Sequence, residues 1–282
     1  MAREYVARDP RTGERIGAKP KGARKGVGIA ALSPDSGPWQ RLESHEILPL
    51  ANGESGKIEI LADGKRWLLG RIDAIKALAK VPEKDAERAY DSLVDALEDD
   101  FPDVRIAALK TLPSFSLRRQ GILLHCLSDR LQDEEDSVRE EAMTCLKKVA
   151  PLFPSGCEEI LRRELRDSRK DHRGNAFEAL KLASRDWPEV GCLHLDELIR
   201  EEEDDLRIRG SLILRTIASK GGAEAWDLIG WSLQDEEVRV RRNASKTLTI
   251  LADVEPRVAV ILVESSICLL YTSDAADDFD CV

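Results

Sequence analysis

The sequence predicts an all-α protein: a right-handed solenoid of about six helical hairpins of 34 residues, followed by a seventh that is incomplete. Three observations predict it. An arginine motif recurs at a fixed period, a pair of apolar residues recurs at the same period, and an acidic turn separates the two. A period of this length is typical of stacked helical repeats. The motif Arg-x-x-(Ala/Gly)-x-x-x-Leu begins at Arg71, Arg105, Arg139, Arg173, Arg207 and Arg241.

The first helix of each hairpin is predicted from apolar residues four positions apart, which lie on one face of a helix. These pairs are Leu93 and Leu97, Leu127 and Leu131, Leu161 and Leu165, Leu195 and Ile199, and Ile229 and Leu233. Acidic residues follow each pair. Because they complement the dipole of a helix start and cap its free N–H groups, they indicate a turn before a second helix.

The second helix of each hairpin begins near the arginine and has its own apolar stripe. The small residue lies in the middle of that stripe, where it lets the paired helix come close. It is Ala74, Ala108, Ala142, Ala176, Gly210 or Ala244. Prolines fall in the connectors that follow, where a helix should stop; they are Pro82, Pro154, Pro188 and Pro256. We expect no strand after about residue 64.

The stretches Asp103–Ala108 and Ser137–Ala142 resemble the core D-x-x-V-R-x-x-A-x-x-x-L of HEAT repeats. The chain looks like a prokaryotic member of that family, in the short form also seen in phycobilisome-lyase-like proteins. The resemblance covers roughly residues 55 to 266. It implies an α-solenoid of the armadillo-like helical type. Functions in the family are diverse, so the resemblance favours a scaffold without naming its ligand.

An acidic residue precedes most of the motif arginines by six positions. The expected ladder consists of Asp99 with Arg105, Asp133 with Arg139, Asp167 with Arg173, Glu201 with Arg207, and Asp235 with Arg241. Each pair can form within one repeat or with the adjacent one. In similar proteins such a ladder tethers neighbouring repeats. Surface pairs contribute only about 0–1 kcal/mol each, so apolar stacking should dominate the stability.

The two ends differ from the repeats. Residues 1–38 are predicted to be a disordered basic arm, since residues 1–28 carry eight basic side chains against Glu4, Asp9 and Glu14. Residues 39–69 are expected to form an N-terminal cap and the first repeat helix, with 57–61 either a strand or a helix start. The array should span residues 70–267.

Residues 268–282 resemble a translated sequencing adaptor, which predicts a non-native tail on a truncated metagenomic fragment. The seventh repeat should therefore end after a helix over 257–266.

Charge and cysteine usage narrow the function classes. The net charge is −10, and the acidic body argues against wrapping a nucleic-acid duplex. Nucleic-acid or ribonucleoprotein association through residues 1–28 stays open. No apolar run is long enough to span a membrane. Cys126, Cys145, Cys157 and Cys192 form no Cys-x-x-Cys pair, which favours buried thiols in a reducing, cytoplasmic compartment.

Few patterns point to catalysis. His45-Glu46 lacks the second histidine of a zinc-protease helix. Some iron hydroxylases built from HEAT repeats carry several His-Glu pairs, whereas this chain has one pair outside the array. A lyase-like enzyme that holds a tetrapyrrole is a further alternative, supported only at the level of the repeat. We therefore predict no enzyme activity, no cofactor and no metal.

A protein or peptide partner is the leading expectation, bound on the concave face. Second helices usually line that face, and their outward positions are given by the register. The early repeats are polar there, whereas Leu182, Leu212 and Ile250 are apolar in the later ones, with Arg209 among them. A contiguous exposed apolar patch would indicate a partner site. The alternative is that superhelical twist turns these residues into the core.

Overall fold

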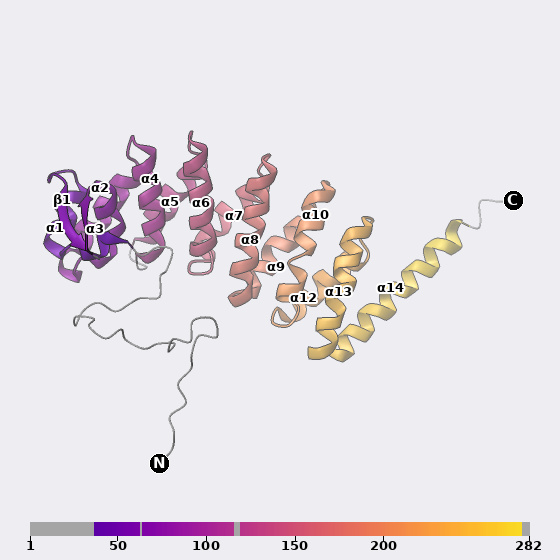
Figure 1. Cartoon of the computed structure of the whole chain (residues 1–282). Helices are drawn as coiled ribbons and strands as arrows, with labels where there is room; N and C mark the ends of the chain where they lie inside the picture. Colours follow the sequence, from indigo (N-terminus) through magenta and orange to yellow (C-terminus); the bar gives the residue numbers. More distant parts are fainter. Residues whose placement is uncertain (1–36, 63, 116–118, 278–282) are drawn as a thin grey trace, which may run out of the picture.

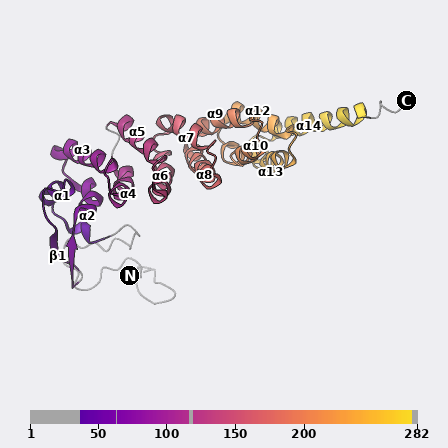
Figure 2. The same ribbon diagram turned by 90° about the horizontal axis from the view of Figure 1, so that it is seen from above.

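The protein is a row of stacked helical hairpins that runs from α1 at one end to α14 at the other (Figure 1). The computed structural model describes residues 37–62, 64–115 and 119–277, with side chains as far as Ser266. First helices lie along one side of the row and second helices along the other (Figure 2). The predicted all-α solenoid is confirmed, with one two-stranded hairpin added near its start.

Five complete hairpins follow the first. The pairs are α3 (Ala86–Leu97) with α4 (Pro102–Thr111), α5 (Gln120–Arg130) with α6 (Asp136–Val149), α7 (Glu158–Glu164) with α8 (Lys170–Asp186), α9 (Pro188–Leu198) with α10 (Asp204–Ser211) and its continuation α11 (Leu214–Ile217), and α12 (Gly222–Leu233) with α13 (Val238–Val254). Short 3-10 helices lie in connectors at Leu78–Lys80, Glu83–Asp85, Leu112–Ser114 and Ser155–Cys157.

The start of the array departs from the prediction. A 3-10 helix (η1, Pro38–Arg41) leads to α1 (Ser44–Ala51), and a hairpin of β1 (Ile58–Ala62) and β2 (Lys65–Leu69) separates α1 from α2 (Arg71–Ala77). The expectation of no strand after residue 64 was therefore wrong. Apolar residues alternate along residues 58–62 and 65–69, on both sides of Asp63-Gly64. An Asp-Gly pair between two such segments is a strong signal for a β-hairpin. Gly64 adopts a positive φ of 73°, and Ile60 pairs with Trp67.

The core lies between the two rows of helices and follows the period. Leu93, Leu127, Leu161, Leu195 and Ile229 of the first helices are fully buried, and so are the alanines at the small position. In α9 and α10 the helices pack so closely that a Cβ on Gly210 would lie 3.2 Å from Leu195 Cδ1 and from Leu198 Cβ. The predicted stripes are thus the surfaces along which neighbouring hairpins stack.

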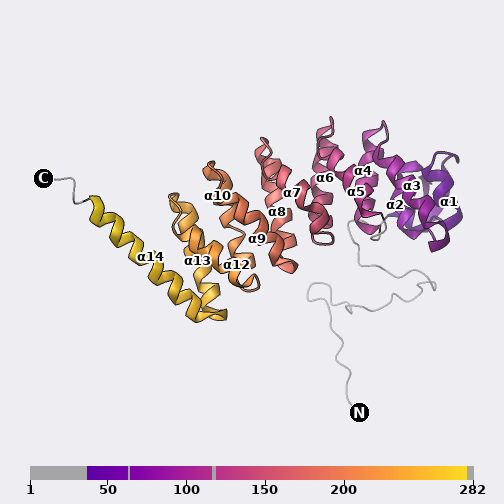
Figure 3. The same cartoon turned by 180° about the vertical axis from the view of Figure 1, so that it is seen from behind.

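The final helix, α14 (Pro256–Asp277), extends past α13 and away from the row (Figure 3). It is longer than the predicted 257–266, because nothing in the sequence after Ser266 breaks a helix. Val258 and Leu262 pack against the core, whereas Val260 and Ile261 are exposed.

Several predictions fall outside the described residues. They include the basic arm over residues 1–36 and the side chains of the adaptor-like tail. In the described part of the chain, no helix is long and apolar enough to cross a membrane. Cys126, Cys145, Cys157 and Cys192 are buried and free.

Candidate functional site

The turns between paired helices form one edge of the array, and the motif arginines lie along it. Each lies near the start of a second helix, and most of their guanidinium groups turn back toward the segment before that helix. In Arg105, Nη1 donates to the main-chain carbonyls of Asp99 at 2.7 Å and Asp100 at 3.1 Å. Arg139, Arg207 and Arg241 make the same contacts in their own repeats. The arginine therefore satisfies carbonyls that the end of the first helix leaves free.

Some of the motif arginines also reach the acid of the next repeat, 28 residues later. Arg71 Nη1 lies 2.6 Å from Asp99 Oδ2, and Arg105 Nη2 lies 2.8 Å from Asp133 Oδ1. Arg207 Nε lies 3.1 Å from Asp235 Oδ2. Most of these acids also accept a main-chain N–H two residues on, which fixes the turn. In the ladder, an arginine therefore binds main-chain carbonyls of its own repeat and a side-chain carboxylate of the next repeat.

The ladder is rerouted in the middle of the array. Arg139 pairs with the exposed Asp136, because Asp167 is held by Arg169 through two contacts of 2.9 and 2.6 Å. That contact lowers the pKa of Asp167 to about 2. Arg173 binds Glu203 and Asp205 instead of Glu201. The pairing changes here because Arg169 competes for Asp167, and because Glu203 and Asp205 compete for Arg173.

The second-helix face holds the residues that the sequence singled out for a partner. Leu212 is 52% exposed, whereas Leu182 and Ile250 are half-buried and Ile250 packs against the core. Arg209 Nε is 2.9 Å from Asp205 Oδ2, and its guanidinium lies against Gly174 of α8. The four residues lie on the neighbouring segments α8, α10–α11 and α13, and Leu212 is the most exposed of the three apolar ones.

Leu212 lies at a break in the second helix of its repeat. The helix is interrupted between α10 and α11, where the N–H groups of Leu212 and Ile213 donate three residues back, to Arg209 and Gly210. The Ser211 hydroxyl also donates to the Ile208 carbonyl at 2.6 Å. Such 3-10 turns inside a helix are common at functional positions.

The first-helix face carries exposed apolar side chains that sequence reasoning missed. Large aromatic side chains usually pack in the core, but Trp231 is 68% exposed and Trp187 is also exposed. Leu193 of α9 is 41% exposed. The signal was available in the register. From Arg105 on, the positions 14 and 10 residues before each motif arginine hold Asp91 and Asp95, His125 and Asp129, Glu159 and Arg163, Leu193 and Glu197, and Asp227 and Trp231.

The groups that suggested chemistry have structural roles. Glu46 accepts from the Glu43 N–H at 2.8 Å, so it caps α1. The donor atoms of Glu164, Asp167 and His172 lie within 4.8 Å of one another, a spacing that a metal ion could bridge. However, Arg163 and Gln132 bind Glu164 and Arg169 binds Asp167, so arginine charges already neutralise these carboxylates.

Burial favours the neutral form of two histidines in the later repeats. Burial lowers the pKa of His194 to about 4, with Arg162 and Arg166 acting in the same direction and Glu197 against it. Burial is also the main cause that lowers the pKa of His172. Both occupy positions that are mostly apolar in the other repeats, which fits packing better than proton transfer.

Comparisons with known proteins agree with the repeat architecture. A family model described as HEAT repeats matches residues 58–147, which confirms the predicted resemblance over that segment. A search of curated proteins found no match. The archaeal HEAT-like repeats protein from Thermococcus onnurineus NA1 is 14% identical, with 74% of this chain and 80% of that chain covered and a TM-score of 0.42.

Two further solved structures are similar in the same way. Computationally designed armadillo repeat proteins for modular peptide recognition are 16% identical, with 73% of this chain and 99% of that chain covered and a TM-score of 0.36. Kap95p, in a structure that concerns its binding to RanGDP, is 14% identical, with 78% of this chain and 31% of that chain covered and a TM-score of 0.47. The likeness concerns stacked helical hairpins.

Proposed function

We propose that this chain is a non-enzymatic protein-binding scaffold whose second-helix face, expected to be the concave one, holds the partner. The observation that carries the proposal is Leu212. It is exposed at a break in an otherwise regular helix, on a face whose other outward residues are mostly polar. A large apolar side chain fixed in that position gains stability only when another molecule covers it.

The surroundings of Leu212 suggest the chemistry of the partner. Exposed Arg215 follows the break and exposed Lys246 lies on α13, whereas the charge of Arg209 on the preceding turn is compensated by Asp205. An apolar centre with a basic rim fits a partner segment that combines a large apolar side chain with carboxylates. Interface anchors of this kind lie in the middle of a contact, while the rim charges mainly guide association.

The non-enzymatic part of the proposal is supported by the roles of the titratable groups. Buried ladder arginines bind turns, Glu46 caps a helix, and the buried histidines occupy packing positions. Candidate catalytic groups in a cleft should instead be free to face a substrate. A cytoplasmic location, inferred from the free cysteines, belongs to the same proposal.

The proposal can be tested by crosslinking from chosen positions. A photoreactive amino acid at position 212 should give a defined adduct with a partner in a lysate of the source cells, and Leu212→Asp combined with a probe at position 250 should abolish it. A probe at position 122 on α5, also an exposed apolar position, is the matched control. Identical adducts from positions 212 and 122 would contradict a partner site on the second-helix face.

Nucleic-acid association is a second candidate, favoured by the basic side chains of residues 1–28, which lie outside the described residues. Deletion of residues 1–28 should then remove salt-sensitive retention of RNA or DNA. Retention that is equal with and without this segment would exclude the idea.

A further inference from the structure

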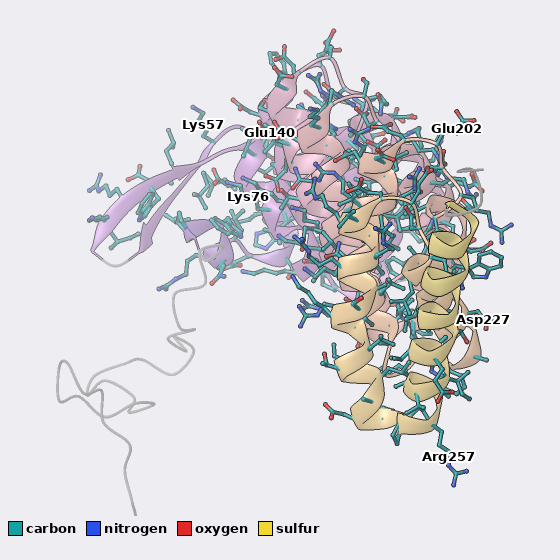
Figure 4. All side chains as sticks on the ribbon, turned by 90° about the vertical axis from the view of Figure 1, so that its right-hand side faces the viewer. Lys57, Lys76, Glu140, Glu202, Asp227 and Arg257 are labelled. Carbon is teal, nitrogen blue, oxygen red and sulfur yellow. The ribbon has the colours of Figure 1, made fainter. Side chains whose placement is uncertain are left out.

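The side of the array opposite the proposed partner site carries an apolar groove. In Figure 4, Asp227 of α12 points away on the first-helix side, whereas Lys76 lies toward the second-helix side. Two adjoining clefts, of about 580 and 570 Å³, follow α9 and share Glu189 and Leu193. We call them together the α9 groove. Its exposed apolar residues are Leu152, Trp187, Leu193 and Trp231.

The walls of the α9 groove are held in place before any ligand binds. The Trp187 indole N–H donates to the Pro151 carbonyl at 3.0 Å, which fixes the plane of the ring. α9 itself is packed tightly on its neighbours, since a Cβ on Gly191 would lie 2.6 Å from Ser184 Oγ and 2.7 Å from Ile217 Cγ2. A surface ordered in advance loses little entropy when it binds, which favours affinity.

The rim of the groove is acidic. Glu158, Glu189, Asp196, Glu224 and Asp227 line it, with Arg200 as the basic lining residue. Arg200 Nη2 is 2.7 Å from Asp196 Oδ1, so these two charges compensate each other. Within the described part of the chain, the other four carboxylates take part in none of the salt bridges. The groove therefore offers uncompensated negative charge on both sides of apolar residues.

We propose that the α9 groove is a second binding site, and that it takes a basic peptide segment with large apolar side chains from a partner protein. Charge complementarity decides the chemistry: lysines or arginines of the segment would meet the rim carboxylates, while its apolar side chains cover Leu193 and Trp231. An arginine could also stack on the exposed indole of Trp231. Tryptophan is strongly enriched among residues that dominate binding energy.

The site lies on a face separate from the proposed partner site around Leu212. The two proposals can therefore fail independently. A scaffold with both would hold an acidic segment on its second-helix face and a basic one on its first-helix face.

Three labelled synthetic peptides test the inference on the full chain by fluorescence anisotropy. The first is an amphipathic helix of about fourteen residues with leucines on one face and lysines elsewhere. The second replaces the lysines by glutamates, and the third replaces the leucines by serines. We expect the first peptide alone to bind, with an affinity that falls as salt is added.

Matched variants locate the site. Trp231→Ser and Leu193→Ser should each weaken binding of the first peptide about tenfold or more. Ile122→Ser, which removes an equally exposed apolar residue from α5 outside the groove, should change it less than about twofold. Leu212→Asp should also leave it unchanged. Circular dichroism melts of all four variants check that they remain folded.

Two results would overturn the inference. Binding of the glutamate peptide as tight as that of the lysine peptide would show that the rim charge does not select the ligand. Equal loss of binding in Trp231→Ser and Ile122→Ser, or no loss in either, would place the peptide elsewhere on the array.

Discussion

The first-helix face and the second-helix face come from one period but expose different chemistry. On the first helices the outward positions are mainly acidic, with Leu193 and Trp231 as apolar exceptions. On the second helices Lys76, Lys110 and Lys246 occupy one outward register position, and the exposed Leu212 occupies the same position in its repeat. The net charge of −10 therefore agrees in sign with the first-helix face but does not describe the second-helix face. The comparison teaches that in a solenoid the charge of the whole chain is a poor guide to the charge of one surface.

The two faces meet at the edge of the array formed by the turns between paired helices, where the arginine ladder lies. The ladder there fixes the orientation of one repeat relative to the next. Three links between repeats are made by an arginine and an aspartate 28 residues later, and the middle of the array uses other partners. Because the edge joins both rows of helices, its loss should disturb both faces together, whereas a change on one face should leave the other intact.

The largest expected effect on stability comes from removing one arginine of the ladder. Arg207→Ala should lower the free energy of unfolding by about 3–5 kcal/mol, because it leaves the buried carboxylate of Asp235 without its cation. The control Arg200→Ala removes an exposed pair with Asp196 and should cost less than about 1 kcal/mol. Urea unfolding measures both. Equal costs would mean that the ladder is no more than a surface feature.

The second effect is confined to the first-helix row and depends on pH. His194 has a folded pKa of about 4, below its usual value near 6.5, so the unfolded state binds more protons in between. Stability should therefore fall as the pH drops from about 6.5 to 4, by up to about 1.4 kcal/mol per pH unit. His194→Leu should flatten that dependence, whereas His125→Leu on an exposed position should not. An unchanged slope in His194→Leu would contradict the prediction.

A third, smaller effect compares one glycine from each row. Gly191→Ala should cost about 1–3 kcal/mol, because its Cβ would overlap Ser184 and Ile217. Gly210→Ala meets only side-chain atoms at 3.2 Å, restores the alanine of the other repeats and gains helix propensity, so it should change stability by less than about 1 kcal/mol. Thermal melts would contradict this reading if the two variants behaved alike.

The smallest effects on stability should come from the exposed apolar residues themselves. Trp231→Ser and Leu212→Asp should each change the free energy of unfolding by less than about 0.5 kcal/mol, because both residues lie on the surface with more than half of their area exposed. Urea unfolding of either variant gives the number. A cost above about 2 kcal/mol would show that the residue packs in the fold, and would remove it as a candidate anchor.

The sequence by itself determined the repeat and its core. A period of 34 residues specifies which side chains share a stripe, so the buried leucines and small residues could be read directly. It also located the turns, because acidic residues and prolines mark helix ends. The first strand of the β-hairpin matches one of the two alternatives that the sequence left open for residues 57–61, whereas its partner strand after Asp63-Gly64 was not predicted, because a two-residue turn signal lies outside the helical period.

The tertiary structure alone decided which side chains of one repeat contact which side chains of the next. A repeat motif defines the face of one helix, but the partner of each side chain depends on the rotation and shift from one hairpin to the next. Arg105 therefore meets Asp133 and not the carboxylate of Asp99, six residues before it. The rotation between hairpins also explains why Ile250 packs against the core while Leu212 is exposed. Trp231 is exposed as well, although a side chain of its size is usually buried.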